Sequence, residues 1–261
     1  MTDLMTSTPV VMSITSHDPC GGGGISADIE TLASLGCHCT PIITQLCARD
    51  TSQLKDSFVT HTSLLIEQIR AVLEDINVNL FSIGDVTSIR NAEAIHTILC
   101  DYSDIPVLLH PGKLKQPDDC GLDQALSTLL LPRSKLLILS KENALALAPS
   151  ADTLAACAQQ ILDSGCNNLL ITGDQTVSTQ IKNHWFLAHS SSQQYTWERL
   201  PYAYQGANDT LAAATSAYLA HGLSMAEAIQ QAQQFTWQAL HQGRRIGMGK
   251  LLPDRMHWCK K

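Results

Sequence analysis

Two short segments of the sequence combine glycine with side chains that can exchange protons or bind a ligand. The first, residues 16–28, reads SHDPCGGGGISAD and follows a short apolar run. Four consecutive glycines let the backbone approach a ligand closely and leave N–H groups exposed near the start of a helix. The chemistry expected there is the binding of a small molecule or of an anionic group.

The second segment, GANDT at residues 206–210, stands directly before an alanine-rich helical pattern. Free N–H groups at a helix N-terminus carry partial positive charge, which suits the charge that develops on a transferred phosphoryl group. Asp209 in this turn can take the proton from an attacking hydroxyl. Asn and Asp are also common helix caps without any catalytic role, so this segment alone leaves both interpretations open.

Two other interpretations of the glycine run stay open at this point. Gly22, Gly24 and Ala27 fit the alanine-ending form of the dinucleotide-binding fingerprint, and Asp50 lies about the right distance downstream. That pattern would indicate a nicotinamide or flavin enzyme. Alternatively, the glycines form a flexible turn that binds nothing.

Composition limits the class of partner. The chain has 261 residues and a formal net charge of −7, which argues against nucleic acid or an anionic membrane as the main partner. No apolar stretch approaches the ~20 residues of a membrane helix, and residues 1–9 lack the basic flank and apolar core of a signal peptide. We therefore expect a cytoplasmic protein.

The cysteines give no sign of a disulfide framework or a metal site. The nine cysteines include no CxxC pair, as is typical of free thiols in a reducing compartment. Cys37, His38 and Cys39 form the only cluster. Alternate side chains of a strand point to opposite faces, so these three could not easily converge on one ion. We predict no direct metal ligand.

The elements that must position the two segments alternate along the chain. Short apolar runs predict strands and 3.6-residue periodicities predict helices, an order typical of a mostly parallel sheet covered on both faces. The predicted strands are 9–15, 39–47, 78–83, 105–109, 135–139 and 168–172, and the predicted helices are 25–35, 64–73, 92–100, 122–131, 151–164, 208–220 and 224–240.

Local features refine this pattern. Pro41 places the beginning of the second strand at an edge of the sheet. Residues 176–204 are polar and aromatic without a long helix, and we interpret them as one or two antiparallel edge strands. Ser224 and Glu227 form a capping-box pattern at the start of the last helix. Residues 111–120 mix Lys, Pro, Asp and Gly, a composition that predicts a mobile loop.

At this point the motifs indicate a family. The run HDPCGGGGISADIETLASLGCHCTPIITQL resembles the N-terminal signature of the hydroxymethylpyrimidine/phosphomethylpyrimidine kinases. GANDTLAAATSAYLAHG falls where that family has its anion hole and helix, and residues 246–250 with His257-Trp258 resemble its Gly-Ile-Gly-Pro and aromatic tail. LLILSKENALALA and LLITGDQ fall in order between them. The resemblance thus covers nearly the whole chain.

The resemblance implies a ribokinase-like fold, a three-layer α/β/α sandwich with a mostly parallel central sheet and antiparallel edge strands, formed by residues 1–261 as a single domain. It implies ATP-dependent phosphorylation of hydroxymethylpyrimidine or its monophosphate in thiamin biosynthesis, with ATP and Mg²⁺ as cofactors. The nucleotide would lie near the C-terminal helices and the alcohol near the N-terminal glycines. The resemblance therefore makes the dinucleotide-binding hypothesis the less favoured one. The family resemblance also suggests a homodimer, although no residue pattern shows one.

The resemblance also implies roles for individual residues. Asp209 would be the general base, and Gly206, Ala207 and Asn208 would form the anion hole. The implied substrate-binding residues are Ser16, Asp18, Gly22, Gly24, Asp28, Arg49 and Asp85, and the implied nucleotide-binding residues are Lys141, Thr172 and Gly173.

Some of these positions depart from the family's pattern. Its anion hole usually reads Gly-Thr-Gly-Cys; Asp209 instead matches the broader ribokinase-like Gly-Ala-Gly-Asp. Asn208 replaces a glycine, and its side chain should crowd the hole and disfavour a positive φ, although Asn is the least penalised replacement there. Lys141 and Ala144 stand where an Asn-x-x-Glu motif helps to place Mg²⁺. Lys141 could contact phosphate oxygens as a point charge, or remain an ordinary solvated lysine.

The implied substrate pocket also departs from the family's pattern. Ser16 replaces a glycine, Arg49 replaces the pyrimidine-contacting Gln, and Asp85 replaces a Met. A buried charge without a partner is costly, so we predict that Arg49 and Asp85 pair across the pocket. Asp28 is retained and could accept hydrogen bonds from a ligand hydroxyl or amine.

Three hypotheses follow. The chain is a hydroxymethylpyrimidine or phosphomethylpyrimidine kinase with Asp209 as base, or a kinase of the same fold for another small alcohol such as a pyridoxine-like vitamer or a polyol. The third hypothesis is a non-catalytic ligand-binding paralogue that kept the fold. Turnover of Mg-ATP separates the first two from the third.

Overall fold

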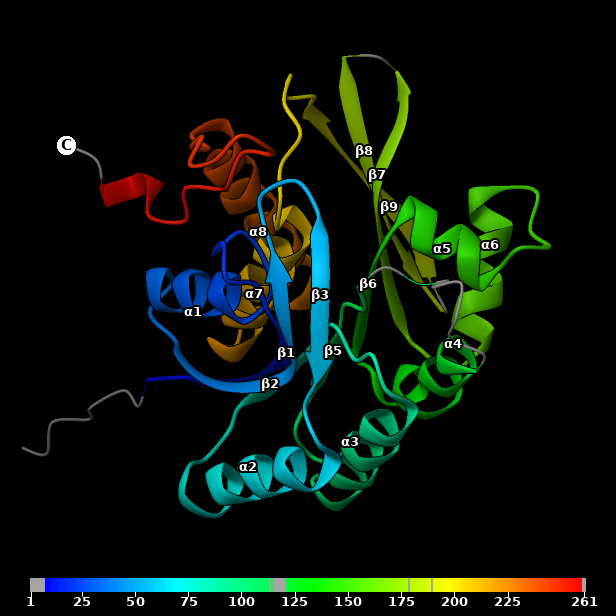
Figure 1. Ribbon diagram of the computed structural model, residues 1–261. Coiled ribbons are helices and arrows are strands. Elements are labelled where there is room, and N and C mark those ends of the chain that lie inside the picture. Colours follow the sequence, from blue (N-terminus) through cyan, green and yellow to red (C-terminus); the bar gives the residue numbers. More distant parts are fainter. Residues whose placement is uncertain (1–7, 113, 115–120, 178, 189, 260–261) are drawn as a thin grey trace, which may run out of the picture.

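The computed structural model describes residues 8–112, 114, 121–177, 179–188 and 190–259. Within them, nine strands form one sheet in the order β3-β2-β1-β4-β5-β6-β7-β8-β9 (Figure 1). Neighbouring strands from β2 across to β7 are parallel, whereas β3, β8 and β9 add antiparallel edges. The strands are β1 (Val10–His17), β2 (His38–Arg49), β3 (Leu54–Val59), β4 (Leu80–Ile83), β5 (Val107–Leu109), β6 (Leu136–Ser140), β7 (Asn168–Val177), β8 (Gln180–Leu187) and β9 (Ser190–Glu198).

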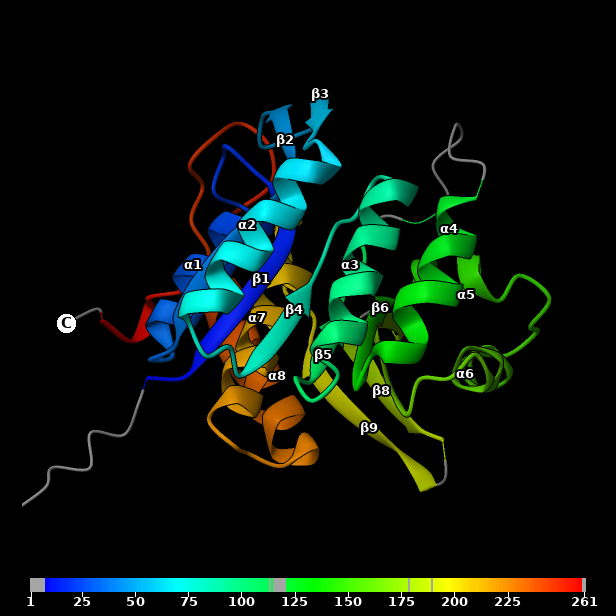
Figure 2. The same cartoon turned by 90° about the horizontal axis from the view of Figure 1, so that it is seen from below.

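Helices cover both faces of this sheet (Figure 1, Figure 2). One face carries α1 (Gly24–Ser34), α7 (Ala207–Ala220) and α8 (Met225–His241). The other face carries α2 (Thr62–Asp75), α3 (Ile89–Asp101), α4 (Leu122–Ala125), α5 (Lys141–Leu147) and α6 (Leu154–Asp163). A π turn (Leu126–Leu130) and a 3₁₀ turn (Leu131–Arg133) continue α4, and a last 3₁₀ turn covers His257–Cys259.

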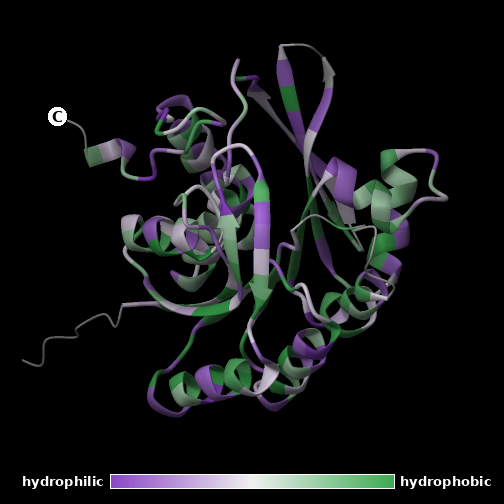
Figure 3. Cartoon of the chain, in the orientation of Figure 1, coloured by the Kyte–Doolittle hydropathy of each residue, from purple (hydrophilic) through white to green (hydrophobic). Residues whose placement is uncertain are grey.

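The two helical layers follow from the alternation of side chains along each strand. In β1, Val11 packs with α1, α7 and α8, whereas its neighbour Met12 packs with α2 and α3, and both are fully buried. A parallel strand buried on both faces reads as a continuous apolar run, as β6 does. Each such buried side chain contributes about 1.5–3 kcal/mol. The covering helices carry hydrophobic and hydrophilic stretches side by side (Figure 3).

The structure confirms the predicted fold class. Pro41 lies in the first half of β2, which pairs only with β1, because β3 joins β2 from Gln45 onward. Residues 176–204 supply the predicted edge strands β8 and β9. The capping box at Ser224 is present. The predicted mobile loop at 111–120 falls mostly outside the described residues.

Two elements escaped the sequence analysis. All six residues of β3 are exposed, so its sequence shows no apolar alternation. The short helix α5 follows β6 directly. Ser140 is the N-cap of α5, because its side chain accepts a hydrogen bond from the Asn143 N–H. Both elements extend the carboxyl edge of the sheet, where α7 also begins. Among the described residues, no helix is long and apolar enough to cross a membrane.

Candidate active site

The two segments singled out by the sequence meet in one crevice at the carboxyl ends of the parallel strands. It has a volume of about 560 Å³. Ligands of open α/β sheets bind at this edge. The predicted residues that line it are Ser16, Asp18, Gly24, Arg49, Asp85, Gly206, Ala207, Asn208 and Asp209; Gly22, Asp28, Lys141, Thr172 and Gly173 are not among the described residues of its lining.

Asp18 shapes the glycine turn. Its carboxylate accepts hydrogen bonds from the Cys20 N–H at 2.9 Å and the Gly23 N–H at 2.8 Å, and also from the Gln205 side chain. Gly24 has a φ of 54°, and a Cβ there would lie 2.1 Å from the Ser16 carbonyl oxygen, so the turn requires glycine. Asp18 is 3% exposed. It therefore holds the shape of the turn more than it offers a free carboxylate to a ligand.

The N-terminus of α7 closes the other side of the crevice. Gly206 precedes the helix with a φ of 79°, and a Cβ on it would lie 1.6 Å from the Gly22 carbonyl oxygen, so the two glycine segments touch. Asn208 lies inside the first helical turn and needs no positive φ, which corrects the expected penalty. Its side-chain oxygen accepts a hydrogen bond from the Thr172 hydroxyl at 3.3 Å. The first N–H groups of an α-helix have no acceptor within the helix, and Ala207, Asn208 and Asp209, which begin α7, line the crevice.

Asp209 faces the glycine turn across this crevice. A Cβ on Gly23 would lie 2.5 Å from Asp209 Oδ2, so glycine alone leaves room for the carboxylate. The Asp209 side chain is 31% exposed. A carboxylate and helix N-terminal amides therefore border one ligand-sized space, as the phosphotransfer hypothesis requires.

The predicted pair between Arg49 and Asp85 does not form. Arg49 Nε lies 3.8 Å from Asp18 Oδ1 instead. Asp85 accepts hydrogen bonds from the Ser16 hydroxyl at 3.3 Å and from the Gly112 N–H, so local donors meet its needs. Burial, followed by the negative charge of Asp209, raises the pKa of Asp85.

Asp28 lies beneath the crevice and not in it, which corrects its expected ligand contact. The residue is fully buried on α1 and accepts a hydrogen bond from Ser13 on β1. Burial chiefly raises the pKa of the Asp28 carboxyl to about 8, and the charge of Asp209 adds to the rise.

Replacing Asp28 by asparagine should make stability less sensitive to pH. The carboxyl pKa rises from 3.8 to about 8 on folding, so between these values the folded chain holds a proton that the unfolded chain releases. Wild-type stability from this residue is therefore present below about pH 4 and falls as pH rises towards 8. Urea unfolding should show the stability of Asp28→Asn rising relative to wild type by on the order of 4 kcal/mol between pH 4.5 and pH 8. Asp104 is exposed, so the control Asp104→Asn should show no such gain. If stability depends on pH in the same way in wild type and in Asp28→Asn, the raised pKa of Asp28 is wrong.

Lys141 is committed to an ion pair. Its Nζ donates to Asp174 Oδ1 at 2.7 Å, and His184 Nε2 lies 3.2 Å from Oδ2 of the same carboxylate. Hydrogen bonds from Lys141 and His184 lower the pKa of Asp174, against the opposing effect of burial, which is the largest single influence. Lys141 is thus paired and is not an ordinary solvated lysine. Its predicted role in nucleotide binding remains a prediction.

Thr172 and Gly173 lie on β7 beside the start of α7. The Thr172 hydroxyl bonds the Leu139 carbonyl oxygen at 3.2 Å as well as Asn208. The Gly173 N–H donates to Asn183 at 3.0 Å, so this amide is already used. Their role in nucleotide binding likewise stays a prediction.

Sequence reasoning missed three residues of this region. His110 directly follows β5 and lines the crevice, and its place after a predicted strand was an available signal. Gln205 directly precedes the turn at residues 206–210 and donates to Asp18. Arg255 gave no local signal, because its partners Gly21 and Gly22 lie 234 and 233 residues earlier in the chain.

Arg255 joins the two glycine segments from below. It is 2% exposed. Its guanidinium donates to the carbonyl oxygens of Gly21 at 3.1 Å and Gly22 at 2.5 Å, to the Thr210 hydroxyl at 3.0 Å and to Glu30 at 2.9 Å. One side chain from the C-terminal tail therefore fixes the glycine turn against the first turn of α7.

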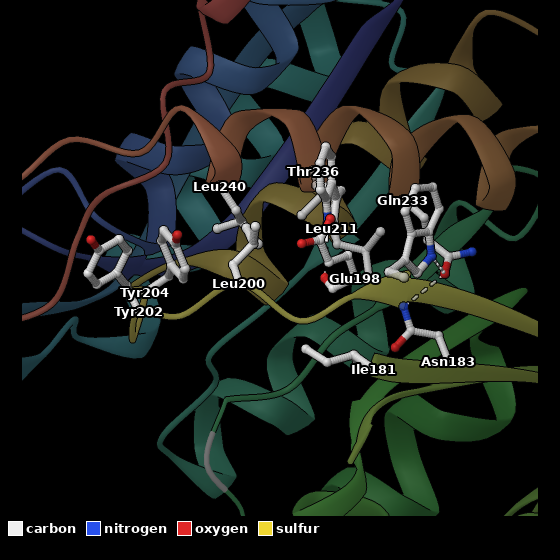
Figure 4. Close-up of a pocket in the computed structure, with 12 residues that line it drawn as sticks. Ile181, Asn183, Glu198, Leu200, Tyr202, Tyr204, Leu211, Gln233, Thr236 and Leu240 are labelled. Carbon is white, nitrogen blue, oxygen red and sulfur yellow. Dashed lines mark hydrogen bonds between the residues drawn. The ribbon is translucent and has the colours of Figure 1, made fainter. Parts of the chain in front are cut away.

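A second, more apolar pocket adjoins the crevice, and Tyr204 borders both (Figure 4). Its volume is about 130 Å³. Gln233 is held at its end, because its side-chain oxygen accepts hydrogen bonds from Asn183 at 2.8 Å and Trp197 at 3.0 Å. The walls are Ile181, Asn183, Trp197, Glu198, Leu200, Tyr202, Tyr204, Leu211, Gln233, Thr236, Trp237 and Leu240.

The remaining motifs of the sequence lie outside the crevice. Asp50 stands in the β2–β3 turn, where it accepts from the Ser52 and Gln53 N–H groups and pairs with Lys55 at 2.9 Å, so the dinucleotide interpretation has no support. Cys37 and Cys39 are free thiols. Over the described part of the chain, no group of three His, Cys, Asp or Glu side chains is arranged to hold a metal ion.

Fold and crevice together define a class. A mostly parallel sheet with antiparallel edges, a glycine turn after its first strand and an acid at a late helix N-terminus belong to a ribokinase-like small-molecule kinase. The sequence model of the phosphomethylpyrimidine kinase family matches residues 18–254. The chain therefore belongs to this family.

Individual relatives agree with that assignment. The hydroxymethylpyrimidine/phosphomethylpyrimidine kinase of Escherichia coli (strain K12) is 28% identical over 248 residues, which cover 91% of this chain and 93% of the relative. The pyridoxal kinase from Staphylococcus aureus in complex with AMP-PCP and pyridoxal superimposes with a TM-score of 0.85 at 22% identity, over 97% of this chain and 95% of that one. The phosphomethylpyrimidine kinase from Clostridium difficile 630 gives a TM-score of 0.75 at 21% identity, over 88% of this chain and 100% of that one. At these identities the two structures establish the fold alone.

Proposed function

We propose that this kinase transfers the γ-phosphoryl group of ATP to hydroxymethylpyrimidine or to its monophosphate, in thiamin biosynthesis. The observation that carries the proposal is the Asp209 carboxylate at the N-terminus of α7, facing Gly23 across the crevice. Family membership and the function named for the Escherichia coli relative support the choice of acceptor.

In the proposed reaction the acceptor oxygen lies between Asp209 and the γ-phosphorus. As that oxygen forms its bond to phosphorus, the bond from phosphorus to the β–γ bridging oxygen breaks and ADP leaves. Asp209 takes the proton of an attacking hydroxyl. The N–H groups of Ala207, Asn208 and Asp209 stabilise the charge on the transferring group.

The crevice suits Mg²⁺ bound mainly through phosphates and water. Mg²⁺ commonly keeps several waters and takes one or two protein carboxylates beside substrate phosphates. Glu142, in the first turn of α5, lines the crevice together with Asp209. Glu142 would hold the ion, in place of the residues at 141 and 144 expected from the family's pattern. When bound, Mg²⁺ would supply charge neutralisation at the phosphates.

The apolar pocket of Figure 4 is the proposed site of the nucleoside. It is bordered by α8, the C-terminal helix that the sequence analysis associated with the nucleotide, and it meets the crevice at Tyr204. Its aromatic walls suit a planar base. The bound AMP-PCP of the Staphylococcus aureus pyridoxal kinase supports ATP as donor in this fold.

Filling this pocket should weaken nucleotide binding. Leu240→Trp adds bulk to a wall of a pocket of only about 130 Å³, so we expect the KM for ATP to rise about tenfold or more, a loss of ~1.4 kcal/mol in binding. The KM for the alcohol should stay within twofold, as measured by steady-state ADP release. Leu64→Trp on α2, 48% exposed, is the matched control. An unchanged KM for ATP would place the nucleoside elsewhere.

A kinase for another small alcohol is the second candidate. Arg49 and Asp85 make the pocket more polar than the family's Gln and Met would, and the pyridoxal complex of the Staphylococcus aureus enzyme shows that this fold accepts a pyridine alcohol. A pyridoxine-like vitamer is therefore the alternative acceptor.

The test is an ADP-release screen with Mg-ATP against hydroxymethylpyrimidine, its monophosphate, the pyridoxine vitamers and several polyols. Turnover of either pyrimidine at least tenfold above every other acceptor is expected. Preference for a vitamer would select the alternative. Acceptor binding by calorimetry without any turnover would identify a non-catalytic ligand-binding paralogue.

Three broader properties complete the proposal. All of residues 1–261 form one kinase domain, as the single sheet supports. The protein acts in the cytoplasm, and the free thiols of the described cysteines are typical of that reducing compartment. The active form is a homodimer, by analogy with the family, and sedimentation tests that state.

A further inference from the structure

His110 is a buried histidine with one nitrogen turned towards the proposed base. It follows β5 at the floor of the crevice, and its side chain is 2% exposed. Nδ1 lies 3.9 Å from Asp209 Oδ1 and has no hydrogen-bond partner in the described part of the chain. A buried polar atom left unsatisfied costs about 1–3 kcal/mol, so its placement calls for a function.

The imidazole ring is held firmly, whereas its neighbour is free to move. The His110 N–H continues the sheet ladder to the Ile83 carbonyl oxygen at 2.8 Å. The ring packs on Gly84, where a Cβ would lie 2.8 Å from His110 Cε1 and 2.3 Å from Thr15 Oγ1. Asp209 is partly exposed, so rotation of its carboxylate can close the 3.9 Å gap when the crevice fills.

The neighbours of the two ring nitrogens assign the tautomer. An ionised carboxylate only accepts hydrogen bonds, so the nitrogen facing Asp209 must carry the hydrogen. Nε2 then has a free lone pair, and the Ser82 hydroxyl, 3.4 Å away, can donate to it. Burial lowers the pKa of His110, against the opposing charge of Asp209, which favours the neutral ring.

We propose that neutral His110 is the positioning residue of the base: it donates Nδ1–H to one oxygen of Asp209 and so aims the other at the acceptor. This rests on the proposed function of Asp209. Other acidic groups surround this pair. The charge of Asp209 acts on Asp85 after β4 and on Asp28 on α1, and Glu142 lines the same crevice. Positive charge opposes them, since Arg49 acts on Asp85 and Arg255 acts on Asp28.

The experiment compares His110→Asn with His110→Gln in the full-length protein. An asparagine amide falls near the Nδ1 position and can still donate to Asp209, whereas a glutamine amide falls near Nε2. In His110→Gln we expect the acid limb of the kcat/KM profile to move about one pH unit upwards and kcat at the optimum to fall about tenfold. His110→Asn should keep the limb within ~0.3 unit. Ser82→Ala should give an intermediate shift, because it frees Nε2 to take the hydrogen.

Several results would overturn the proposal. An unmoved acid limb in His110→Gln, or equal shifts in His110→Asn and His110→Gln, would show that His110 only fills space. His96→Gln on α3 controls for loss of a histidine. If the wild type turns over no acceptor, the proposed function fails, and ¹⁵N NMR of the imidazole still tests the pairing. In wild type we expect the ring hydrogen of His110 on Nδ1. In Asp209→Ala this tautomer should no longer predominate. A ring hydrogen on Nε2 in wild type would refute the proposal.

Discussion

Replacing Asp209 by asparagine is expected to lower kcat by ~10²–10⁴-fold, which is the usual contribution of a positioned base. Asparagine keeps the shape of the side chain and the room that Gly23 leaves for it, but it cannot take up a proton at neutral pH. The helix N-terminus and the glycine turn remain, so acceptor binding should change less than threefold. Single-turnover phosphoryl transfer and calorimetric acceptor binding measure the two effects separately.

The matched control is Asp163→Asn at the exposed end of α6, which should leave kcat unchanged. An Asp209→Asn variant with wild-type turnover would show that Asp209 is not the general base. A variant that also loses acceptor binding would show that the carboxylate holds the ligand as well as the proton.

The second large effect is expected at Arg255. Arg255→Met should lower the free energy of unfolding by about 3–5 kcal/mol, because it leaves buried carbonyl groups and one end of an ion pair without their donor. Arg255→Lys should recover less than half of this loss. Lysine keeps the charge, but it lacks the planar fork that reaches Gly21, Gly22 and Thr210 at once. Urea unfolding followed by tryptophan fluorescence gives the free energies.

The same variants should affect turnover beyond stability. At temperatures where Arg255→Lys is fully folded, kcat should still fall several-fold, because the glycine turn and the first turn of α7 are no longer fixed together. Arg70→Lys, on a pair with Asp101 at 3.7 Å whose two side chains are 55% and 54% exposed, should cost less than about 0.5 kcal/mol. If the free energy of unfolding of Arg255→Met lies within ~1 kcal/mol of the wild-type value, Arg255 does not hold the two glycine segments together.

Much of the fold was accessible from the sequence. Continuous apolar runs such as β6 are typical of strands buried on both faces, and their alternation with helical periodicities predicted a mostly parallel sheet covered on both sides. Pro41 correctly marked the start of β2 as an edge, because only β1 pairs with that part of the strand. The exposed strand β3 left no apolar signature, so only its pairing with β2 identifies it.

Pairings across the site were less accessible. Arg49 was expected to pair with Asp85, but the folded glycine turn brings Asp18 nearer. Asp28 kept the family's residue type and yet lies under the crevice, because α1 turns that side towards β1. Asn208 seemed to demand an unusual φ, yet it sits in an ordinary helical turn.

By itself the sequence determined which residue types stand after which strands, and hence the fold, the kinase family and the place of Asp209. These are local properties, since periodicity and motif spacing act within a few tens of residues. Only the tertiary structure decided which side chains lie together: Arg49 by Asp18, Lys141 by Asp174, neutral His110 by Asp209, and Arg255 by both glycine segments. Electrostatic and hydrogen-bond energies depend on separations of a few ångströms between side chains far apart in the chain, and no one-dimensional pattern fixes those.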